Sequence, residues 1–280
     1  MPLSINTNIA SLTAQRSFLN SNSALETAFE RLSTGKRINS ASDDAAGLAI
    51  ATDLNSRVSG LNQAVRNVND GISMVQIMEG TYDEVTSILQ RMRDMAVQAA
   101  NGSLTSTEQG YLETEQTALQ SALTDALEQA TFGSTALITA EDTSGTSLST
   151  SIDIQTGANT GDRVSLTISS ASGSNITALG ITAIDLDSAA TAAIGLADAA
   201  IGIVATQRAQ LGAYQSQLES TVRNLSNVAE NTAAAAGRIM DTDYAAETAN
   251  LTKAQILQQA ATSVLAQANA QPQAVLSLLQ

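Results

Sequence analysis

Hydrophobic residues recur at helical spacing along most of this chain. Between Leu54 and Val75 the apolar positions step alternately by four and three, and the same stepping resumes from Tyr82 to Ala96 after a change of phase near Met78. This alternation is typical of a coiled-coil seam. It predicts one continuous helix over about 43–100, which would be roughly 87 Å long at 1.5 Å per residue. The pair Asn101-Gly102 is expected to end it.

One further helix is predicted before this one and three are predicted after it. Apolar spacing from Ile5 to Leu32, followed by Gly35, predicts a first helix. A capping-box pattern at Thr105 and Glu108 opens another, and the pattern breaks at Phe132-Gly133. A heptad register returns from about 186 to 239, although Arg208, Gln215 and Thr232 occupy core-type positions in it. The last helix covers roughly 243–270, and Pro272 is expected to interrupt it.

The segment 139–183 differs from the rest because it is rich in Ser, Thr and Gly. Ile152 and Ile154 are two positions apart, and so are Val164 and Leu166, so each pair would lie on one face of a strand. A Gly-containing loop over 157–162 separates the two segments. This arrangement predicts a β-hairpin. A disordered insert is the alternative that composition leaves open.

The predicted fold class is mainly α: an elongated helical bundle or coiled-coil rod with a small β-hairpin region. Two domains are expected. Residues 1–42 and 240–280 form an inner domain in which the terminal helices pair as a coiled coil. Residues 43–239 form a rod domain of long helices, with the hairpin inserted at about 140–183.

Composition excludes several kinds of chemistry. The 280 residues include no His and no Cys, which removes His/Cys zinc sites, Ser-His-Asp and Cys-His catalysis and disulfides. A net charge of −14 and 2% aromatic residues argue against nucleic-acid binding. Asp43-Asp44 is interpreted as a helix-capping pair rather than a metal site. We therefore expect no enzyme, no cofactor and no metal, and no apolar run long enough to insert in a membrane.

The two ends of the chain share an unusual composition. Residues 1–15 and 254–280 carry no charged side chain, yet both show helical apolar spacing. Two helices in contact leave about half of each surface exposed, and ordering them costs backbone entropy, so the pair would be marginal alone. Neighbouring molecules that cover the exposed faces would stabilise it. This favours a polymer whose core is assembled from chain termini.

Several motifs occur together in a familiar order. They are Ser4–Asn8, Arg31–Ser40, Asp43–Ile50, Leu89–Gln98, Lys253–Ala260 and Ser263–Asn269. Over about 1–140 and 190–280 the chain resembles bacterial flagellin, and Gln155–Asn159 resembles the hairpin motif of that family. Only about 45–50 residues separate the helical halves, so the resemblance is to a short form without a large outer domain.

The resemblance implies a structural subunit of the extracellular flagellar filament, which serves swimming motility. It implies export by the flagellar type III apparatus without a cleaved signal peptide. The implied partners are further copies of the chain in a helical homopolymer, an export chaperone, the filament cap and the hook–filament junction proteins. A hook–filament junction protein and a cell-surface adhesin of flagellin type remain the alternatives.

Two sets of site residues follow from this resemblance. The candidates for assembly of the filament core are Leu3, Ile5, Ile9, Leu12, Leu257, Val264, Leu265, Val275, Leu278 and Leu279. Arg91, Met95 and Glu115 match the family positions that contact Toll-like receptor 5 of animal hosts, although Met95 replaces the usual Leu. The same stretch is expected to pack subunits along the filament, with Arg91 in an ordinary ion pair.

Overall fold

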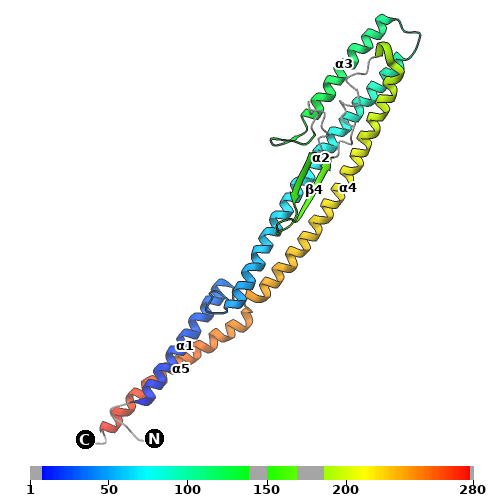
Figure 1. The fold of residues 1–280 in the computed structure, drawn as a ribbon. Helices are drawn as coiled ribbons and strands as arrows, with labels where there is room; N and C mark the ends of the chain where they lie inside the picture. The colour runs from blue at the N-terminus through cyan, green and yellow to red at the C-terminus, as the bar shows by residue number, and fades with distance from the viewer. Residues whose placement is uncertain (1–7, 139–149, 169–185, 278–280) are drawn as a thin grey trace. The chain divides into compact units, whose positions relative to one another are not determined.

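A computed structural model describes residues 8–138, 150–168 and 186–277 (Figure 1). Its long helices are α1 (Ile9–Thr34), α2 (Ala45–Ala99), α3 (Ser106–Glu128), α4 (Leu186–Met240) and α5 (Tyr244–Ser277). Two antiparallel hairpins are formed by β1 (Thr131–Phe132) with β2 (Thr135–Ala136), and by β3 (Thr150–Gln155) with β4 (Arg163–Ile168). The predicted mainly-α class is confirmed.

The chain divides into two compact units. Residues 1–58 and 230–280 make up one, called here the terminal unit, and residues 59–229 make up the other, the central unit. The predicted domain boundaries lie just before α2, at 42, and at the last residue of α4, at 240, whereas the two units divide well inside these helices. The first turns of α2 and the last turns of α4 therefore belong to the terminal unit.

Local signals in the sequence set the helix ends. The side chain of Asn8 accepts a hydrogen bond from the Ser11 amide at 3.1 Å and caps α1. Gly35 ends α1 with φ of 71°, a conformation that glycine adopts without steric cost. At the start of α3, the Glu108 carboxylate accepts from the amide of Thr105 at 2.8 Å, as the capping-box prediction requires. These bonds lower the pKa of Glu108.

The core of the central unit follows a continuous seam along α2. Its buried positions are Ala64, Val68, Gly71, Val75, Met78, Tyr82, Val85, Leu89, Met92, Ala96 and Ala99. They step by four and three without interruption, so the predicted change of phase near Met78 is wrong. At Ala64 and Gly71 the buried positions of the seam hold small residues, while the larger neighbours Leu61, Val65 and Ile72 are only half-buried.

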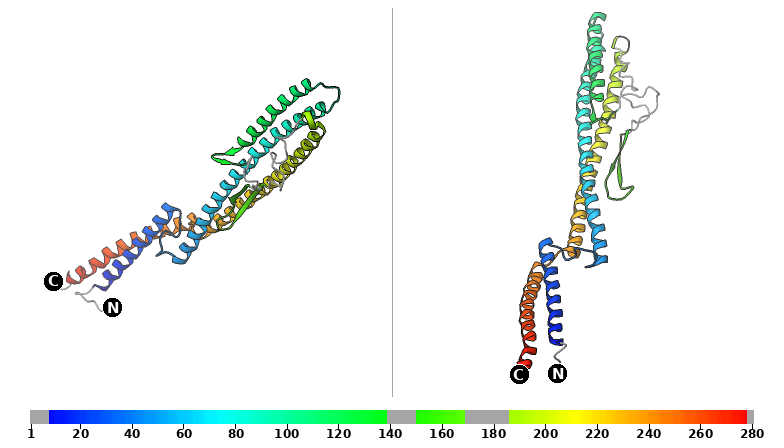
Figure 2. Two further views of the ribbon diagram at one scale, coloured as in Figure 1. Left: turned by 45° about the horizontal axis from the view of Figure 1, so that its top comes forward. Right: turned by 90° about the vertical axis from the view of Figure 1, so that its left-hand side faces the viewer.

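The predicted β-hairpin is confirmed as β3–β4. Ile152 pairs with Leu166 and Ile154 with Val164, and one residue of each pair, Ile154 and Leu166, is buried in the core. The hairpin lies against α2 and α4 (Figure 2). A Cβ on Gly71 would collide with Ile154, so the glycine permits this close approach. The Tyr214 hydroxyl of α4 receives a bond from the Thr167 amide at 3.2 Å and donates to the Thr167 carbonyl at 3.3 Å.

Two predictions for the second half of the chain need correction. Arg208 does not occupy the α4 seam: Gln207 is buried there, while the Arg208 guanidinium reaches Glu79 and Asp83 at the surface. Pro272 does not interrupt the last helix, because α5 continues to Ser277. Proline removes one backbone donor, and here the turns on both sides keep their helical conformation.

One stretch, Ala190–Met240, is long and apolar enough to cross a membrane by length and composition. This is weak evidence, since a core helix of a soluble protein passes the same test. Ala193, Ala197 and Ala200 of this stretch lie in the core of the central unit or close to it. The absence of membrane insertion stays a prediction.

Candidate assembly surface and recognition pair

Helices α1 and α5 of the terminal unit run side by side in opposite directions (Figure 2). The fully buried residues between them are nearly all small. They are Ser11, Ala14 and Ala28 on α1 and Glu247, Ala254, Ala261 and Ala268 on α5. Small side chains allow two helix backbones to approach closely, since the distance between helix axes depends on the side chains at the contact.

Seven large apolar side chains of the same two helices are exposed, whereas Phe18, Leu25, Leu32, Leu251 and Leu265 are half-buried on the seam. Ile9 is 68% exposed, Leu19 64% and Ile256 60%. Leu12, Phe29, Leu257 and Val264 are about half exposed. Soluble monomers rarely expose so many aliphatic side chains on one element pair, and such surfaces mark sites of association. The terminal unit therefore combines a seam of small and half-buried large residues with an outer face that carries exposed large apolar residues.

The predicted assembly residues fall into three groups. Ile9, Leu12, Leu257 and Val264 are exposed in the single chain. Leu265 is half-buried and lies on the α1–α5 seam instead. The other predicted residues, Leu3, Ile5, Leu278 and Leu279, lie outside the described residues, as does the side chain of Val275.

Sequence reasoning missed two features of this surface. It did not single out Leu19, Phe29 and Ile256 as exposed, because their spacing alone does not distinguish an inner from an outer face. It also missed the polar contacts that cross the seam. Asn8 donates to the Ala268 carbonyl at 2.7 Å, Ser11 to the Asn269 side chain at 2.8 Å, and Gln258 to the Asn22 side chain at 3.2 Å.

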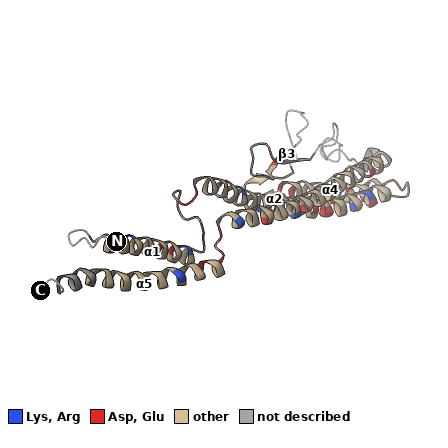
Figure 3. Cartoon of the chain, turned by 90° about the horizontal axis from the view of Figure 1, so that it is seen from below, with Lys and Arg blue, Asp and Glu red and all other residues tan. Residues whose placement is uncertain are grey.

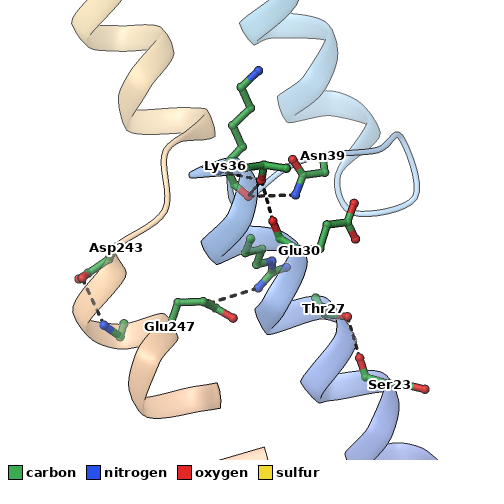
Figure 4. Close-up of polar contacts among 10 residues, drawn as sticks. Ser23, Thr27, Glu30, Lys36, Asn39, Asp243 and Glu247 are labelled. Atoms are coloured by element: carbon green, nitrogen blue, oxygen red, sulfur yellow. Dashed lines mark hydrogen bonds and ion pairs between the residues drawn. The ribbon is translucent and has the colours of Figure 1, made fainter. Parts of the chain in front are cut away.

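Backbone bonds fasten the end of α1 to the start of α5. The Arg37 amide donates to the Met240 carbonyl at 2.6 Å, and the Thr242 amide donates to the Gly35 carbonyl at 3.0 Å. One helical turn further, the guanidinium of Arg31 lies 3.8 Å from the carboxylate of Glu247, which is largely buried (Figure 4). These contacts fix where the two helices begin to pair.

Asp43 and Asp44 act as turn and capping residues. Asp43 accepts hydrogen bonds from the backbone amides of Ser40 and Asn39, which lower its pKa, Ser40 having the larger effect. Asp44 accepts from the Gly47 amide at 2.9 Å, inside the first turn of α2. Among the described residues, no group of three or more His, Cys, Asp or Glu side chains is placed to hold a metal ion.

Arginine side chains link α2 and α4 of the central unit. Figure 3 marks the basic residues of these helices in blue and the acidic ones in red. Arg93 of α2 binds Asp198 of α4 at 2.6 Å, and Arg208 of α4 binds Glu79 of α2 at 2.7 Å. Each carboxylate raises the pKa of its arginine, first through the hydrogen bond and then through its charge. Because these groups are substantially exposed, each pair contributes little to stability alone.

The candidate recognition residues lie in different environments. Arg91 of α2 and Glu115 of α3 form an exposed ion pair at 2.6 Å, as expected for neighbouring antiparallel helices. Met95 is only 1% exposed and belongs to the core. Met95 is therefore not accessible beside Arg91 in the single chain, and its part in recognition stays a prediction. Met95 is one helical turn from Arg91 but is buried, so the candidates that remain exposed are the charged pair Arg91 and Glu115.

Comparison with known proteins identifies the family of this chain. Residues 5–143 match the family region described as "Bacterial flagellin N-terminal helical region", and residues 194–279 match "Bacterial flagellin C-terminal helical region". The two matches together span more than half of the chain. The chain belongs to the bacterial flagellin family.

Full-length relatives agree with this assignment. Flagellin of Halalkalibacterium halodurans is 42% identical over 278 residues, with 99% of each chain covered. The flagellar filament 33 kDa core protein of Treponema phagedenis is 38% identical over 284 residues, again with 99% of each covered. Flagellin A of Vibrio anguillarum is 35% identical over 379 residues and fully covered. That alignment is longer than the 280 residues here, so this chain is a short form of the family.

Proposed function

We propose that this chain is a structural subunit that polymerises into a flagellar filament for swimming, through the outward apolar side chains of α1 and α5. One observation carries the proposal: the α1–α5 pair leaves seven large apolar side chains exposed, namely Ile9, Leu12, Leu19, Phe29, Ile256, Leu257 and Val264. Flagellins are filament subunits, and the family relationship supports this role. The filament is an extracellular appendage, which is where the subunit acts.

The exposed residues supply the driving force for association. Fully burying an aliphatic side chain is worth about 1.5–3 kcal/mol. Ile9, Leu12, Leu257 and Val264 are already partly covered in the single chain, so their further burial offers on the order of 5 kcal/mol per subunit. A single α1–α5 pair cannot gain this energy itself, since its own seam is already closed.

Charged substitutions on the outer face test this proposal. Leu12→Asp and Leu257→Asp place a carboxylate on exposed positions, so the single chain should keep its helical circular dichroism while seeded polymerisation is lost. Leu265→Asp is the comparison variant, because Leu265 lies on the seam and its replacement should disturb the α1–α5 pair as well. Filaments of normal length from Leu12→Asp and Leu257→Asp, seen by electron microscopy, would reject the proposed surface.

The hairpin region is proposed to face the outside of the filament. Thr160 lies in the exposed loop between β3 and β4. Charged residues inserted beside Thr160 should leave filament formation and swimming largely intact, because nothing apolar has to be covered there. Loss of filaments from folded, exported protein would contradict this placement.

Export and further partners belong to the same proposal. The subunit is exported by the flagellar type III apparatus without a cleaved signal peptide, and it meets an export chaperone, the filament cap and the hook–filament junction proteins. It carries out no catalysis and binds no cofactor. Mass spectrometry of the secreted protein tests the first point, since removal of an N-terminal segment during export would contradict it.

A second candidate role is recognition of the free subunit by Toll-like receptor 5 of a host. The observation in its favour is the exposed Arg91–Glu115 pair at a position that resembles the family's recognition site. Arg91→Ala should weaken activation of receptor-bearing cells by the monomer, whereas Met95→Leu should change it little, because Met95 is buried. Equal activity of the wild-type and Arg91→Ala monomers would remove Arg91 from this role.

A further inference from the structure

The buried residues of the α1–α5 seam repeat every seven positions. On α5 the repeating alanines are Ala254, Ala261 and Ala268, and on α1 the small residues are Ala14, Ser21 and Ala28. Sliding one helix along the other by seven residues places small side chains against small side chains again. The displacement would be about 10 Å at 1.5 Å per residue. Packing of these alanines therefore does not distinguish the observed register from its neighbours.

Larger seam residues repeat with the same period. Phe18, Leu25 and Leu32 are seven apart on α1, and Leu251, Gln258 and Leu265 are seven apart on α5. Gln258 stands where the pattern would otherwise give a third leucine. Its amide donates to the side chain of Asn22, and both residues are half-buried on the seam. This pair is the point at which the repeat is broken.

Among the described residues, the polar side-chain contacts across the seam fit one register. In an antiparallel pair, the numbers of facing residues have a constant sum, and these contacts give sums of 276 to 280. After a slip by one heptad, Asn22 would face Leu251 or Leu265 in place of Gln258. Its half-buried amide would then lose its hydrogen-bond partner, so the slipped register would be less stable than the observed one.

We propose that the Asn22–Gln258 pair sets the register along the seam, together with Ser11–Asn269 and Arg31–Glu247 and with the backbone bonds that join Arg37 to Met240 and Thr242 to Gly35. A single polar pair within an apolar seam can specify the alignment of two helices at some cost in stability. Register matters for assembly because it aligns the outer side chains of α1 with those of α5. A slipped pair would shift Leu257 and Val264 by two turns relative to Ile9 and Leu12. This last step rests on the proposed function, whereas the register itself does not.

Three variants of the full chain separate register from packing. Asn22→Leu with Gln258→Leu removes the pair and completes the leucine repeat. Asn22→Gln with Gln258→Asn exchanges the two amides and keeps a pair. Asn20→Leu with Gln259→Leu makes the same kind of change at neighbouring exposed positions, and serves as the matched control.

Register can be measured directly because the chain contains no Cys. Spin labels on Ser17→Cys and Ser263→Cys lie on exposed positions at the same level of α1 and α5. Electron–electron distance measurements should give one distance for the wild type, the exchanged pair and the control. The double-leucine variant should add a second population, displaced by about 10 Å along the pair, and its seeded elongation should slow about tenfold, the equivalent of one ordinary hydrogen bond.

A single distance in the double-leucine variant would overturn the proposal, and so would a spread of registers in the wild type. The proposed function fails in a different way. If the wild type shows one register and never polymerises, the assembly role is lost and the register assignment stands. If the double-leucine variant populates two registers, the assignment holds whatever its elongation rate.

Discussion

A buried amide in α3 offers the sharpest test of the packing described for the central unit. Gln116 is 1% exposed, and neither its side-chain nitrogen nor its oxygen has a hydrogen-bond partner among the described residues. A polar group left unpaired in the interior costs about 1–3 kcal/mol. Methionine has the same unbranched length and no amide, so Gln116→Met should remove this cost without opening a cavity.

The expected gain is about 1–2 kcal/mol, allowing for imperfect packing of the new side chain. For a unit of 150–250 residues, each kcal/mol corresponds to roughly 2–4 °C, so Tm should rise by about 2–8 °C. Differential scanning calorimetry of the full chain measures this shift. The control is Gln98→Met at an exposed position of α2, which should change Tm by less than about 1 °C. A lower Tm for Gln116→Met would show that the amide is satisfied in solution, for example by an internal water molecule, and would refute the reasoning.

Three further predictions follow from single residues. Gly35→Ala should destabilise the terminal unit by about 1–2 kcal/mol in urea titrations, because an L side chain at φ of 71° is strained and its Cβ would lie 2.8 Å from the Tyr244 hydroxyl; unchanged stability would contradict the left-handed cap. Tyr214→Phe should reduce the free energy that holds β4 against α4 by about 0.5–1.5 kcal/mol. It should speed amide exchange at Thr167, while exchange in α5 stays the same. Burial raises the pKa of Tyr82 to about 12, so the folded state favours the protonated phenol. The stability that the buried phenol contributes is fully present below pH 10 and is lost as pH rises toward 12. Tyr82→Phe should flatten the fall in Tm above pH 10, and equal slopes for the two proteins would rule out the buried phenol as its cause.

The sequence by itself determined most of the local structure. Gly35, Asn101-Gly102 and the Thr105–Glu108 capping box mark helix ends because they satisfy backbone groups or adopt backbone angles that few other residues allow. The two-residue spacing of Ile152 and Ile154 predicted the hairpin for a similar reason, since successive side chains of a strand point to opposite faces and alternate residues share one face. The long motifs also identified the family, because their order along the chain is specific. These features depend on residues close together in the chain.

The tertiary structure decided which face of each helix is buried. Spacing of large apolar residues indicated an interruption at Met78 and a core role for Arg208, but Ala64, Gly71 and Gln207 occupy the buried positions instead. The resemblance offered Met95 as a recognition residue, although it is 1% exposed and belongs to the core of the central unit. In the terminal unit alanines are the fully buried residues of the seam, while Leu12, Leu19 and Leu257 are exposed. A hydrophobic pattern weights large side chains, whereas closely packed helices select small ones, and only the partner helix determines which of the two prevails.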